Sequence, residues 1–312
     1  MMNLTLATEH MFTIAKVTSV FFNITFIFGL FGNFMIIAAT IKSRDLRNPC
    51  NVLIAFQAAA DLLLGVGHPP YLYYAYNKYL IPFAECFDIQ VLSFDAMNVS
   101  TIMVFFIGVD RVISVKFAVF YKTVNSYLYV TMVIGSALTY NSALNVIAYY
   151  TLTEDLTMCL VPEAYTGLGK KVAFSSHLML NILVLCVYTY LNSIVSSVSG
   201  SRNRKLIRSL RMVVLCTVFG WFITFLLCNI GMMLSSDKNF LLATDMVAGF
   251  FACTHVVIPF IIYYLKSTVY RSAFRSILIF PNLNFAAVGV TSKGGVTAVY
   301  QPRPVVVVTD NN

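Results

Sequence analysis

Residues Cys86 to Tyr121 read CFDIQVLSFDAMNVSTIMVFFIGVDRVISVKFAVFY. The stretch begins with a cysteine, continues through mostly apolar residues, and ends in the pair Asp110-Arg111 followed by Lys116. Cys86 and Arg111 are 25 positions apart (111 − 86). A helix that rises about 1.5 Å per residue covers roughly 38 Å over that separation, more than a hydrocarbon core of about 30 Å. The stretch therefore predicts one membrane-spanning helix with a cysteine at one end and an acid–arginine pair at the other.

The arginine at the end of this stretch has two interpretations. A charged side chain inside a membrane boundary is costly unless it is paired, and such residues are often functional. The neighbouring Asp110 can pair with Arg111. A long arginine side chain can also simply extend to the lipid headgroups at a helix end. Charge placement alone leaves both interpretations open.

The overall composition is that of a polytopic membrane protein. Hydrophobic residues make up 59% of the 312 residues and charged residues 11%, whereas soluble proteins average about 45–50% apolar and about 25% charged residues. The mean hydropathy is +0.79. The net charge of +8 does not require a nucleic-acid partner. We expect the apolar surface of this protein to contact the lipid bilayer, and we expect no nucleic-acid partner.

Seven apolar stretches are long enough to cross a bilayer, and they predict an all-α membrane protein with a seven-transmembrane helix bundle over residues 17–265. Besides the opening stretch, they cover about residues 17–41, 51–73, 127–150, 171–198, 206–234 and 240–265. We expect residues 1–16 to form a polar extracellular N-terminus, 266–278 a short amphipathic helix at the inner interface, and 279–312 a cytoplasmic tail. Within residues 1–278, fourteen lysines and arginines fall on the side of Arg111 and five on the other side, which places the N-terminus outside the cell.

Three segments carry a resemblance to a known family. Residues 105–122, FFIGVDRVISVKFAVFYK, resemble the end of the third transmembrane helix of rhodopsin-like G-protein-coupled receptors. Residues 62–68, LLLGVGH, and residues 263–274, YYLKSTVYRSAF, narrow the resemblance to the nematode serpentine chemoreceptors of class SX (SRSX). The resemblance extends over about residues 27–274. It implies a receptor in the plasma membrane, or the ciliary membrane of sensory neurons, that binds an extracellular small molecule or peptide and activates a heterotrimeric G protein.

The resemblance gives roles to residues near the inner ends of the spans. It implies that Asp110 and Arg111 hold the resting state and that Arg111 turns toward the G protein on activation, although Val112 follows where tyrosine is commonest. Residues 255–264, HVVIPFIIYY, resemble a degraded Asn-Pro-x-x-Tyr motif; aligned on Tyr263, Pro259 takes the asparagine position. The inner end of the sixth span carries no acid, so we expect no ion pair of the rhodopsin type between that span and Arg111.

Asp61 is a carboxylate near the middle of the second span. An acid at that depth is functional by default, and the alternative is a neutral acid bonded to a neighbouring helix. The resemblance implies an allosteric sodium ion at Asp61, with Ser100 as a ligand and Asn33 meeting the aspartate. Alternatively, Asn33 bonds to a carbonyl of its own helix. Pro259 in place of the asparagine departs from that sodium site, and we expect no other metal or cofactor.

The outer halves of the spans are expected to enclose a ligand cavity. The resemblance places Ser93, Met97, His177, Trp221 and Phe225 there, with Trp221 as the switch beneath the ligand. The alternative is that Trp221 fills the bundle centre and that His177 makes a structural hydrogen bond, which is the commoner role of a lone polar side chain in a bundle.

Asp95 is a second acid within the opening stretch. It could act as the counter-ion of a basic ligand, or it could bond to Asn141 or Asn145 of the next span. We favour the second interpretation, because the receptor register turns Asp95 away from the cavity.

Seven cysteines are too few and too scattered for a disulfide scaffold. Cys86 and Cys159 lie at the ends of predicted spans on the same side, and the resemblance pairs them in a disulfide bond. Asn3-Leu4-Thr5 is a glycosylation sequon in the expected extracellular N-terminus.

Two other function classes fit a polytopic protein. A transporter or ligand-gated channel would place polar groups along a path at the midplane and often carries internal repeats, and this chain shows no repeat. A membrane enzyme would need a nucleophile with its base or a metal cluster, which His177 and His255 alone do not supply. The residues therefore favour a receptor, with the channel or transporter as the alternative.

Overall fold

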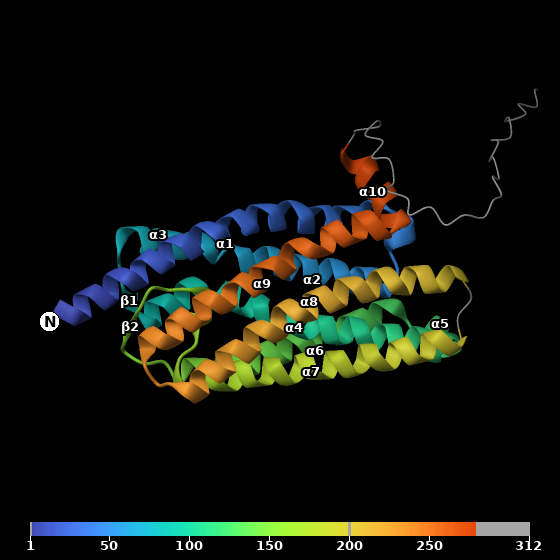
Figure 1. Ribbon diagram of the computed structural model, residues 1–312. Helices are drawn as coiled ribbons and strands as arrows, with labels where there is room; N and C mark the ends of the chain where they lie inside the picture. Colours follow the sequence, from blue (N-terminus) through green and yellow to red (C-terminus); the bar gives the residue numbers. More distant parts are fainter. Residues whose placement is uncertain (1, 199–200, 279–312) are drawn as a thin grey trace, which may run out of the picture. The chain divides into compact units, whose positions relative to one another are not determined.

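The structure is a computed structural model that describes the backbone of residues 2–198 and 201–278 and the side chains of residues 9–194, 212, 216 and 219–278. Over this range it consists almost entirely of helices (Figure 1). The α-helices are α1 (Met2–Lys42), α2 (Pro49–Gly65), α3 (His68–Asn77), α4 (Phe83–Lys116), α5 (Ala118–Thr123), α6 (Ser126–Tyr149), α7 (Gly167–Val198), α8 (Ser201–Leu234), α9 (Lys238–Lys266) and α10 (Thr268–Leu278). The remaining elements are the 3-10 helices η1 (Arg44–Leu46) and η2 (Val161–Ala164) and the antiparallel strands β1 (Ile81–Pro82) and β2 (Leu156–Thr157).

The predicted seven-helix bundle is confirmed. Among the described residues, 6 helical segments are long and apolar enough to cross a membrane, and residues 219–234 of α8 form a shorter apolar segment. α2 and α3 together make one of the 6 segments. The strands β1 and β2 lie at the end of the bundle that holds Cys86, called here the outer end, and α5 and α10 lie at the inner end (Figure 1).

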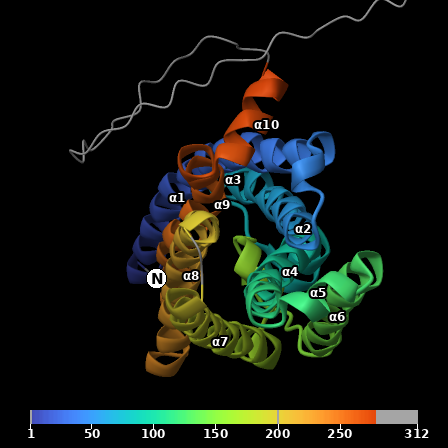
Figure 2. The ribbon, with the colours of Figure 1, turned by 90° about the vertical axis from the view of Figure 1, so that its right-hand side faces the viewer.

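The spanning helices form a closed ring, seen end-on in Figure 2. Around the ring, α1 packs on α2, α2 on α4, α4 on α7, α7 on α8, α8 on α9, and α9 back on α1, while α6 packs against α4 and α7. α4 is the central helix, because 72% of its most apolar window is buried, against 22–50% for the other long spans. The stretch from Cys86 to Tyr121 therefore contains most of the helix around which the bundle is built.

Side chains of the connecting segments set the starts of three helices. The Asn48 side chain accepts a hydrogen bond from the amide of Asn51 at the start of α2. Asn125 caps α6 in the same way, and Asp237 accepts from the amide of Phe240 at the start of α9. Short polar side chains at these positions satisfy amides that the helix leaves unpaired.

The second span is interrupted between α2 and α3. The break falls at Val66 and Gly67, just before Pro69 and Pro70, which begin a new helix because proline cannot donate to the ladder of the preceding turn. The two prolines account for a break at this position. The structure adds its fixing contact: Gln90 of α4 donates from Nε2 to the Gly67 carbonyl over 2.9 Å.

The first helix is longer than predicted. Residues 1–16 were expected to be a polar leader, but α1 begins at Met2, and Met11, Phe12 and Ala15 are buried against the outer end of the bundle. Glu9 pairs with Lys78 over 2.7 Å. The segment contains no proline or glycine that would end a helix. The side chain of Asn3 lies outside the described side chains, so its glycosylation stays a prediction.

The predicted amphipathic helix after the last span is confirmed as α10. Tyr270, Ala273 and Phe274 are buried against the bundle, while Arg275 is exposed. The predicted tail, residues 279–312, lies outside the described residues.

Candidate functional site

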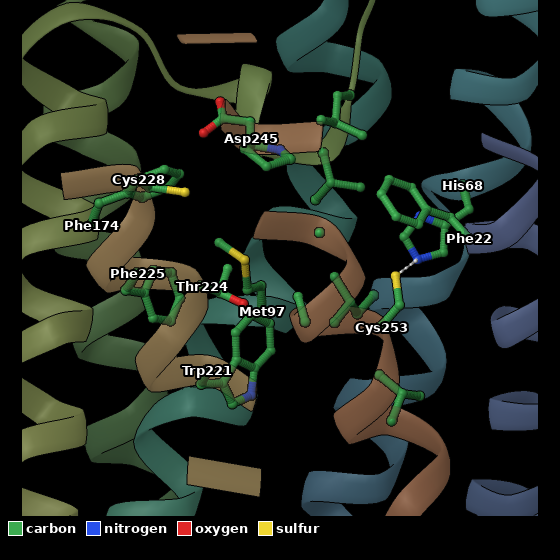
Figure 3. A pocket seen from close by; sticks show the side chains of 17 residues that line it. Phe22, His68, Met97, Phe174, Trp221, Thr224, Phe225, Cys228, Asp245 and Cys253 are labelled. Atoms are coloured by element: carbon green, nitrogen blue, oxygen red, sulfur yellow. Dashed lines mark hydrogen bonds between the residues drawn. The ribbon is translucent and has the colours of Figure 1, made fainter. Parts of the chain in front are cut away.

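A chamber lies inside the outer half of the bundle (Figure 3). This central chamber has a cavity volume of about 50 Å³, within about 560 Å³ of space between atoms that includes open solvent. Its walls come from α1 to α4, η2 and α7 to α9, and most of them are apolar. The lining side chains are Phe22, Leu64, His68, Met97, Leu160, Val161, Pro162, Phe174, Trp221, Thr224, Phe225, Cys228, Asp245, Gly249, Ala252, Cys253 and Val256.

The two ends of the central chamber differ in polarity. Figure 3 shows Trp221 at one end and Asp245 at the other, with Phe174 and Phe225 on one side and His68 and Cys253 on the opposite side. The Sγ of Cys253 lies 3.8 Å from Nε2 of His68. Asp245 is the one carboxylate among the lining residues. An apolar molecule fits these walls, and its orientation would depend on the few polar groups.

The loop before α7 covers the outer side of the chamber. The predicted disulfide bond between Cys86 and Cys159 is confirmed, and it ties this loop to the start of α4. The same Gln90 amide that contacts Gly67 also donates to the Cys159 carbonyl over 2.8 Å. These contacts hold Val161 and Pro162 in the chamber wall. Sequence patterns did not single out Gln90, although a glutamine between apolar residues of a spanning helix is itself a signal.

Three of the five predicted cavity residues line the central chamber, namely Met97, Trp221 and Phe225. Ser93 does not, because its hydroxyl turns to α2 and donates to the Leu63 carbonyl over 3.2 Å. His177 lies behind the wall, where its ring stacks on Phe225 with a centroid distance of 4.6 Å. The structure thus places Ser93 and His177 in supporting positions around the chamber.

Asp95 faces α6 instead of the chamber. Its Oδ1 accepts a hydrogen bond from Nδ2 of Asn145 over 2.7 Å. The Oδ1 of Asn145 in turn accepts from the Tyr165 hydroxyl over 2.5 Å. This is the structural arrangement that the sequence favoured over a ligand counter-ion.

A buried ionic cluster at the outer end was not predicted. Nζ of Lys170 lies 2.5 Å from Oε1 of Glu163 and 2.5 Å from Oδ2 of Asp245. Thr157 also donates to Glu163 over 3.0 Å. Burial alone would raise the pKa of Glu163, but the ammonium of Lys170 outweighs it, and the pKa lies below its ordinary value of 4.5. Asp245 could have been noticed as an acid inside an apolar span, whereas nothing in the sequence pointed to Lys170 as its partner.

A second polar group lies below Trp221, around Asp61. The Ser100 hydroxyl donates to Oδ1 of Asp61 over 2.6 Å, as expected for two residues of one site. Nε2 of His255 lies 3.5 Å from the same oxygen. Asn33 has a different partner from the one expected: its Nδ2 donates to the Val256 carbonyl of α9 over 3.3 Å, although Asn33 and Asp61 line one small cavity. Nothing in the sequence pointed to a contact between His255 and Asp61.

The donors around Asp61 fit a sodium ion poorly. Hard cations prefer several oxygen ligands, and the described neighbours of Oδ1 are one hydroxyl, from Ser100, and the imidazole of His255. Among the described residues, no group of three or more acidic, histidine or cysteine side chains is arranged to hold a metal ion. The sodium ion predicted from the resemblance is therefore untested, and these neighbours of Asp61 argue against it.

Aromatic rings connect the central chamber with Asp61. Trp221 stacks on Phe225 with a centroid distance of 5.2 Å and meets the ring of His255 at 4.3 Å. His255 reaches Asp61 with its other edge. A change in the position of Trp221 would therefore displace His255, which lies beside Asp61.

The inner end of the bundle holds the acid–arginine pair. Arg111 donates to Oδ2 of Asp110 from Nε over 3.0 Å and from Nη2 over 2.7 Å. The Tyr121 hydroxyl of α5 donates to Oδ1 over 2.8 Å, a partner that the sequence did not reveal. Burial and the carboxylate of Asp110 raise the pKa of the Tyr121 hydroxyl. Arg111 is thus paired, as the first interpretation held, instead of extending freely from the helix end.

Arg111 and Tyr263 line one cavity at the inner end. Pro259 lies one turn above Tyr263 inside α9, which continues past it. The tyrosine ring stacks on Tyr270 of α10 at a centroid distance of 4.5 Å. The basic side chains of residues 202–211 lie outside the described side chains, so the expected lack of an ion pair between α8 and Arg111 remains a prediction.

Comparison with known proteins decides the family. Residues 26–278, well over half of the chain, match the model of the family described as "Serpentine type 7TM GPCR chemoreceptor Srsx". This chain belongs to the Srsx family. The match takes in the Asp61 site, the cavity at Arg111 and all lining residues of the central chamber except Phe22, and it confirms the resemblance seen in the sequence.

A human protein shows a weaker likeness to this Srsx chain. The protein described as "Probable G-protein coupled receptor 19" from Homo sapiens is 24% identical over 106 residues, which make up 33% of this chain and 26% of the human protein. The aligned part is about a quarter of that relative. The likeness agrees with the Srsx assignment to a family of G-protein-coupled receptors.

Proposed function

We propose that this Srsx chain is a chemoreceptor of the plasma membrane that binds an extracellular small molecule in the central chamber and activates a heterotrimeric G protein. Family membership supports the coarse function, a seven-transmembrane receptor. The apolar walls of the chamber support a small molecule over a peptide. The family name also supports a sensory role, for which the ciliary membrane of a chemosensory neuron is the expected location.

One observation carries the proposal: the bundle has a chamber at its outer end and a cavity with a paired arginine at its inner end, joined by a chain of contacts. The chain passes from Phe225 through Trp221 and His255 to Asp61. Asp61 and Tyr263 line the same small cavity, and Tyr263 also lines the cavity of Arg111. Two sites that share packed side chains can bias one conformational equilibrium.

In the proposed mechanism, the ligand favours a state in which the inner part of α8 has moved outward. A ligand shifts the equilibrium only by the difference between its affinities for the two states. In the structure described here, Arg111 is held by Asp110, and Asp110 is held by Tyr121. Release of Arg111 from Asp110 would present the guanidinium to the G protein at the opened inner cavity.

The test is G-protein dissociation in cells that express the chain, with and without extracts of environmental cues. Arg111→Ala is compared with the unchanged chain at equal surface expression. We expect a cue-dependent response that the Arg111→Ala variant loses. An intact response in that variant would overturn the mechanism, and a ligand-evoked ionic current without any G-protein response would favour the channel alternative.

A further inference from the structure

The ionic cluster of Glu163, Lys170 and Asp245 joins three separate elements, η2, α7 and α9. Its side chains are only 8%, 11% and 3% exposed, in that order. Buried charges of this kind must be paired, because each has lost most of its hydration. The cluster therefore holds η2, α7 and α9 together at the outer end. Its net charge would attract or repel a charged group that enters the chamber.

The cluster lies between two hollows. Glu163 and Lys170 line an outer vestibule of about 850 Å³, counting the part open to solvent, together with Lys171, Lys238 and Asp155. Asp245 lines the central chamber. Since Lys170 contacts Asp245 directly, a molecule that passes from the vestibule into the chamber meets this ion pair.

The cluster has one negative charge more than it has positive charges. Two carboxylates share the single ammonium of Lys170. A cation that entered the chamber could pair with Asp245 and leave Lys170 with Glu163, which would give two neutral pairs. An anion at Lys170 would instead bring three negative charges to one ammonium in a place with little water, which is strongly unfavourable.

A second observation indicates a polar ligand group in the same chamber. His68 lines the chamber and is only 8% exposed, and its Nδ1 has no hydrogen-bond partner among the described residues. Buried polar atoms without a partner are rare in native proteins and indicate a missing one. Most of the other lining side chains are aromatic or aliphatic, with Phe22, Phe174 and Phe225 among them, and aromatic faces attract cations.

We propose that the central chamber takes an apolar molecule with one amine group, whose ammonium replaces that of Lys170 at Asp245. The inference rests on the proposed function in one respect only, in that this molecule is the agonist of the receptor. Asp95, the acid that the sequence offered as a counter-ion, is bonded to Asn145 on the far side of α4. Asp245 fills that role instead, from the opposite side of the bundle.

A native thiol allows a test that needs no identified ligand. Cys228 lines the chamber together with Asp245 (Figure 3). Methanethiosulfonate reagents transfer their thioalkyl group to a thiolate, with release of the sulfinate. Three of them, bearing an ethylammonium, an ethylsulfonate or a methyl group, are allowed to react with the full-length receptor in lipid nanodiscs. Labelling of Cys228 is followed by peptide mass spectrometry, and each rate is divided by the rate of the same reagent with free 2-mercaptoethanol.

We expect the ammonium reagent to label Cys228 faster than the sulfonate reagent by about tenfold or more, since one uncompensated charge in an enclosed cleft concentrates counter-ions to that extent. In Asp245→Asn the preference should vanish. This variant is expected to fold, because Lys170 keeps Glu163 as its partner. The matched control is Asp155→Asn, which removes the same charge from the outer vestibule, where Asp155 pairs with Lys238 over 2.6 Å, and should keep the preference.

Three outcomes would overturn the proposal. They are a sulfonate rate equal to or above the ammonium rate, a preference that survives in Asp245→Asn, and failure of every reagent to label Cys228 in either chain. The measurement uses no G protein. A cation preference without any G-protein response to amines would therefore remove the proposed function and leave the ligand class standing. A G-protein response to amines without a cation preference at Cys228 would leave the proposed function standing and remove the assignment of the ammonium to Asp245.

Discussion

Nε2 of His255 lies 3.5 Å from Oδ1 of Asp61, the oxygen that already accepts the hydroxyl of Ser100. Nδ1 of the same imidazole contacts the Ala252 carbonyl. A carbonyl only accepts hydrogen bonds, so Nδ1 carries a hydrogen, and Nε2 faces the carboxylate without making a hydrogen bond. The other face of the ring meets Trp221, and His255 is fully buried. The imidazole therefore links the tryptophan of the chamber to the acid of the second span.

Removal of the imidazole should destabilise the receptor. His255→Leu removes the ring that contacts Trp221 and lies beside Asp61, and substitutions of buried residues commonly cost about 0.5–3 kcal/mol. We expect a lower midpoint of thermal unfolding for purified His255→Leu. His68→Leu is the matched control, because the described contact of its ring nitrogens is one weak interaction with Cys253, and it should cost less. In a double-mutant cycle, His255→Leu and Asp61→Asn should be non-additive; strict additivity would show that the two residues do not interact.

Sodium should not stabilise this receptor specifically. The imidazole of His255 faces the Asp61 oxygen that an ion would need. Exchange of sodium chloride for potassium or choline chloride at equal ionic strength should leave the unfolding midpoint unchanged. A rise that appears with sodium alone and disappears in Asp61→Asn would show that the ion binds there after all.

Tyr121 should restrain basal signalling. Its hydroxyl donates to Asp110 over 2.8 Å, and Asp110 holds Arg111. Tyr121→Phe removes one hydrogen bond from the resting arrangement, which is worth about 0.5–1.5 kcal/mol, so basal G-protein dissociation should rise about two- to tenfold. Tyr127→Phe alters a tyrosine that is 82% exposed and serves as the control. Equal basal activity in the two variants at equal surface expression would contradict this role.

The fold was largely predictable from the sequence because membrane-spanning helices reveal themselves by length and apolar content. The break before Pro69 and the helix around Tyr270 were predictable from proline chemistry and amphipathic spacing. The helical extension of α1 through Met11 and Phe12 was not, because it depends on packing against the outer end of the bundle. The composition of residues 1–16 indicates a polar segment. The helix has a buried side only because the outer end of the bundle packs against it.

The candidate site was predictable only in part. Met97, Trp221 and Phe225 follow from the receptor register and line the chamber. Ser93 shows the limit of such reasoning, since a hydroxyl can turn to a carbonyl of the adjacent helix. Lys170 lies 75 positions from its partner Asp245 (245 − 170), and the two acids that share it are 82 positions apart (245 − 163). No spacing rule connects a loop to two helices over such separations.

The Glu163–Lys170 pair should make stability depend on pH below the ordinary pKa of glutamate. The pKa of Glu163 is lowered in the folded chain from an ordinary value of 4.5. The pair therefore stabilises the fold fully above that value and loses its effect as the pH falls through the lowered pKa. We expect the unfolding midpoint to fall more steeply below about pH 4.5 in the unchanged chain than in Glu163→Gln. Glu154→Gln, an exposed change in the same loop, should keep the steep profile; a Glu163→Gln profile as steep as that of the unchanged chain would contradict the prediction.

Gly67 should tolerate no side chain, because three elements meet at its α-carbon. An added Cβ would lie 2.2 Å from Oε1 of Gln90, 2.7 Å from Cγ2 of Val161 and 2.8 Å from Oγ of Ser93. Gln90 cannot simply move away, since its amide also holds the Cys159 carbonyl of the loop over the chamber. Gly67→Ala should therefore lower stability by about 1–3 kcal/mol, as overpacking in well-packed cores does.

Gly135→Ala is the opposite case, with nothing within 4 Å of the added Cβ, and should be neutral or slightly stabilising. Thermal unfolding of the two purified variants compares them directly. If Gly67→Ala proved as stable as Gly135→Ala, the close approach of α4 and the covering loop to the break between α2 and α3 would be refuted, and with it the rigid outer wall of the central chamber.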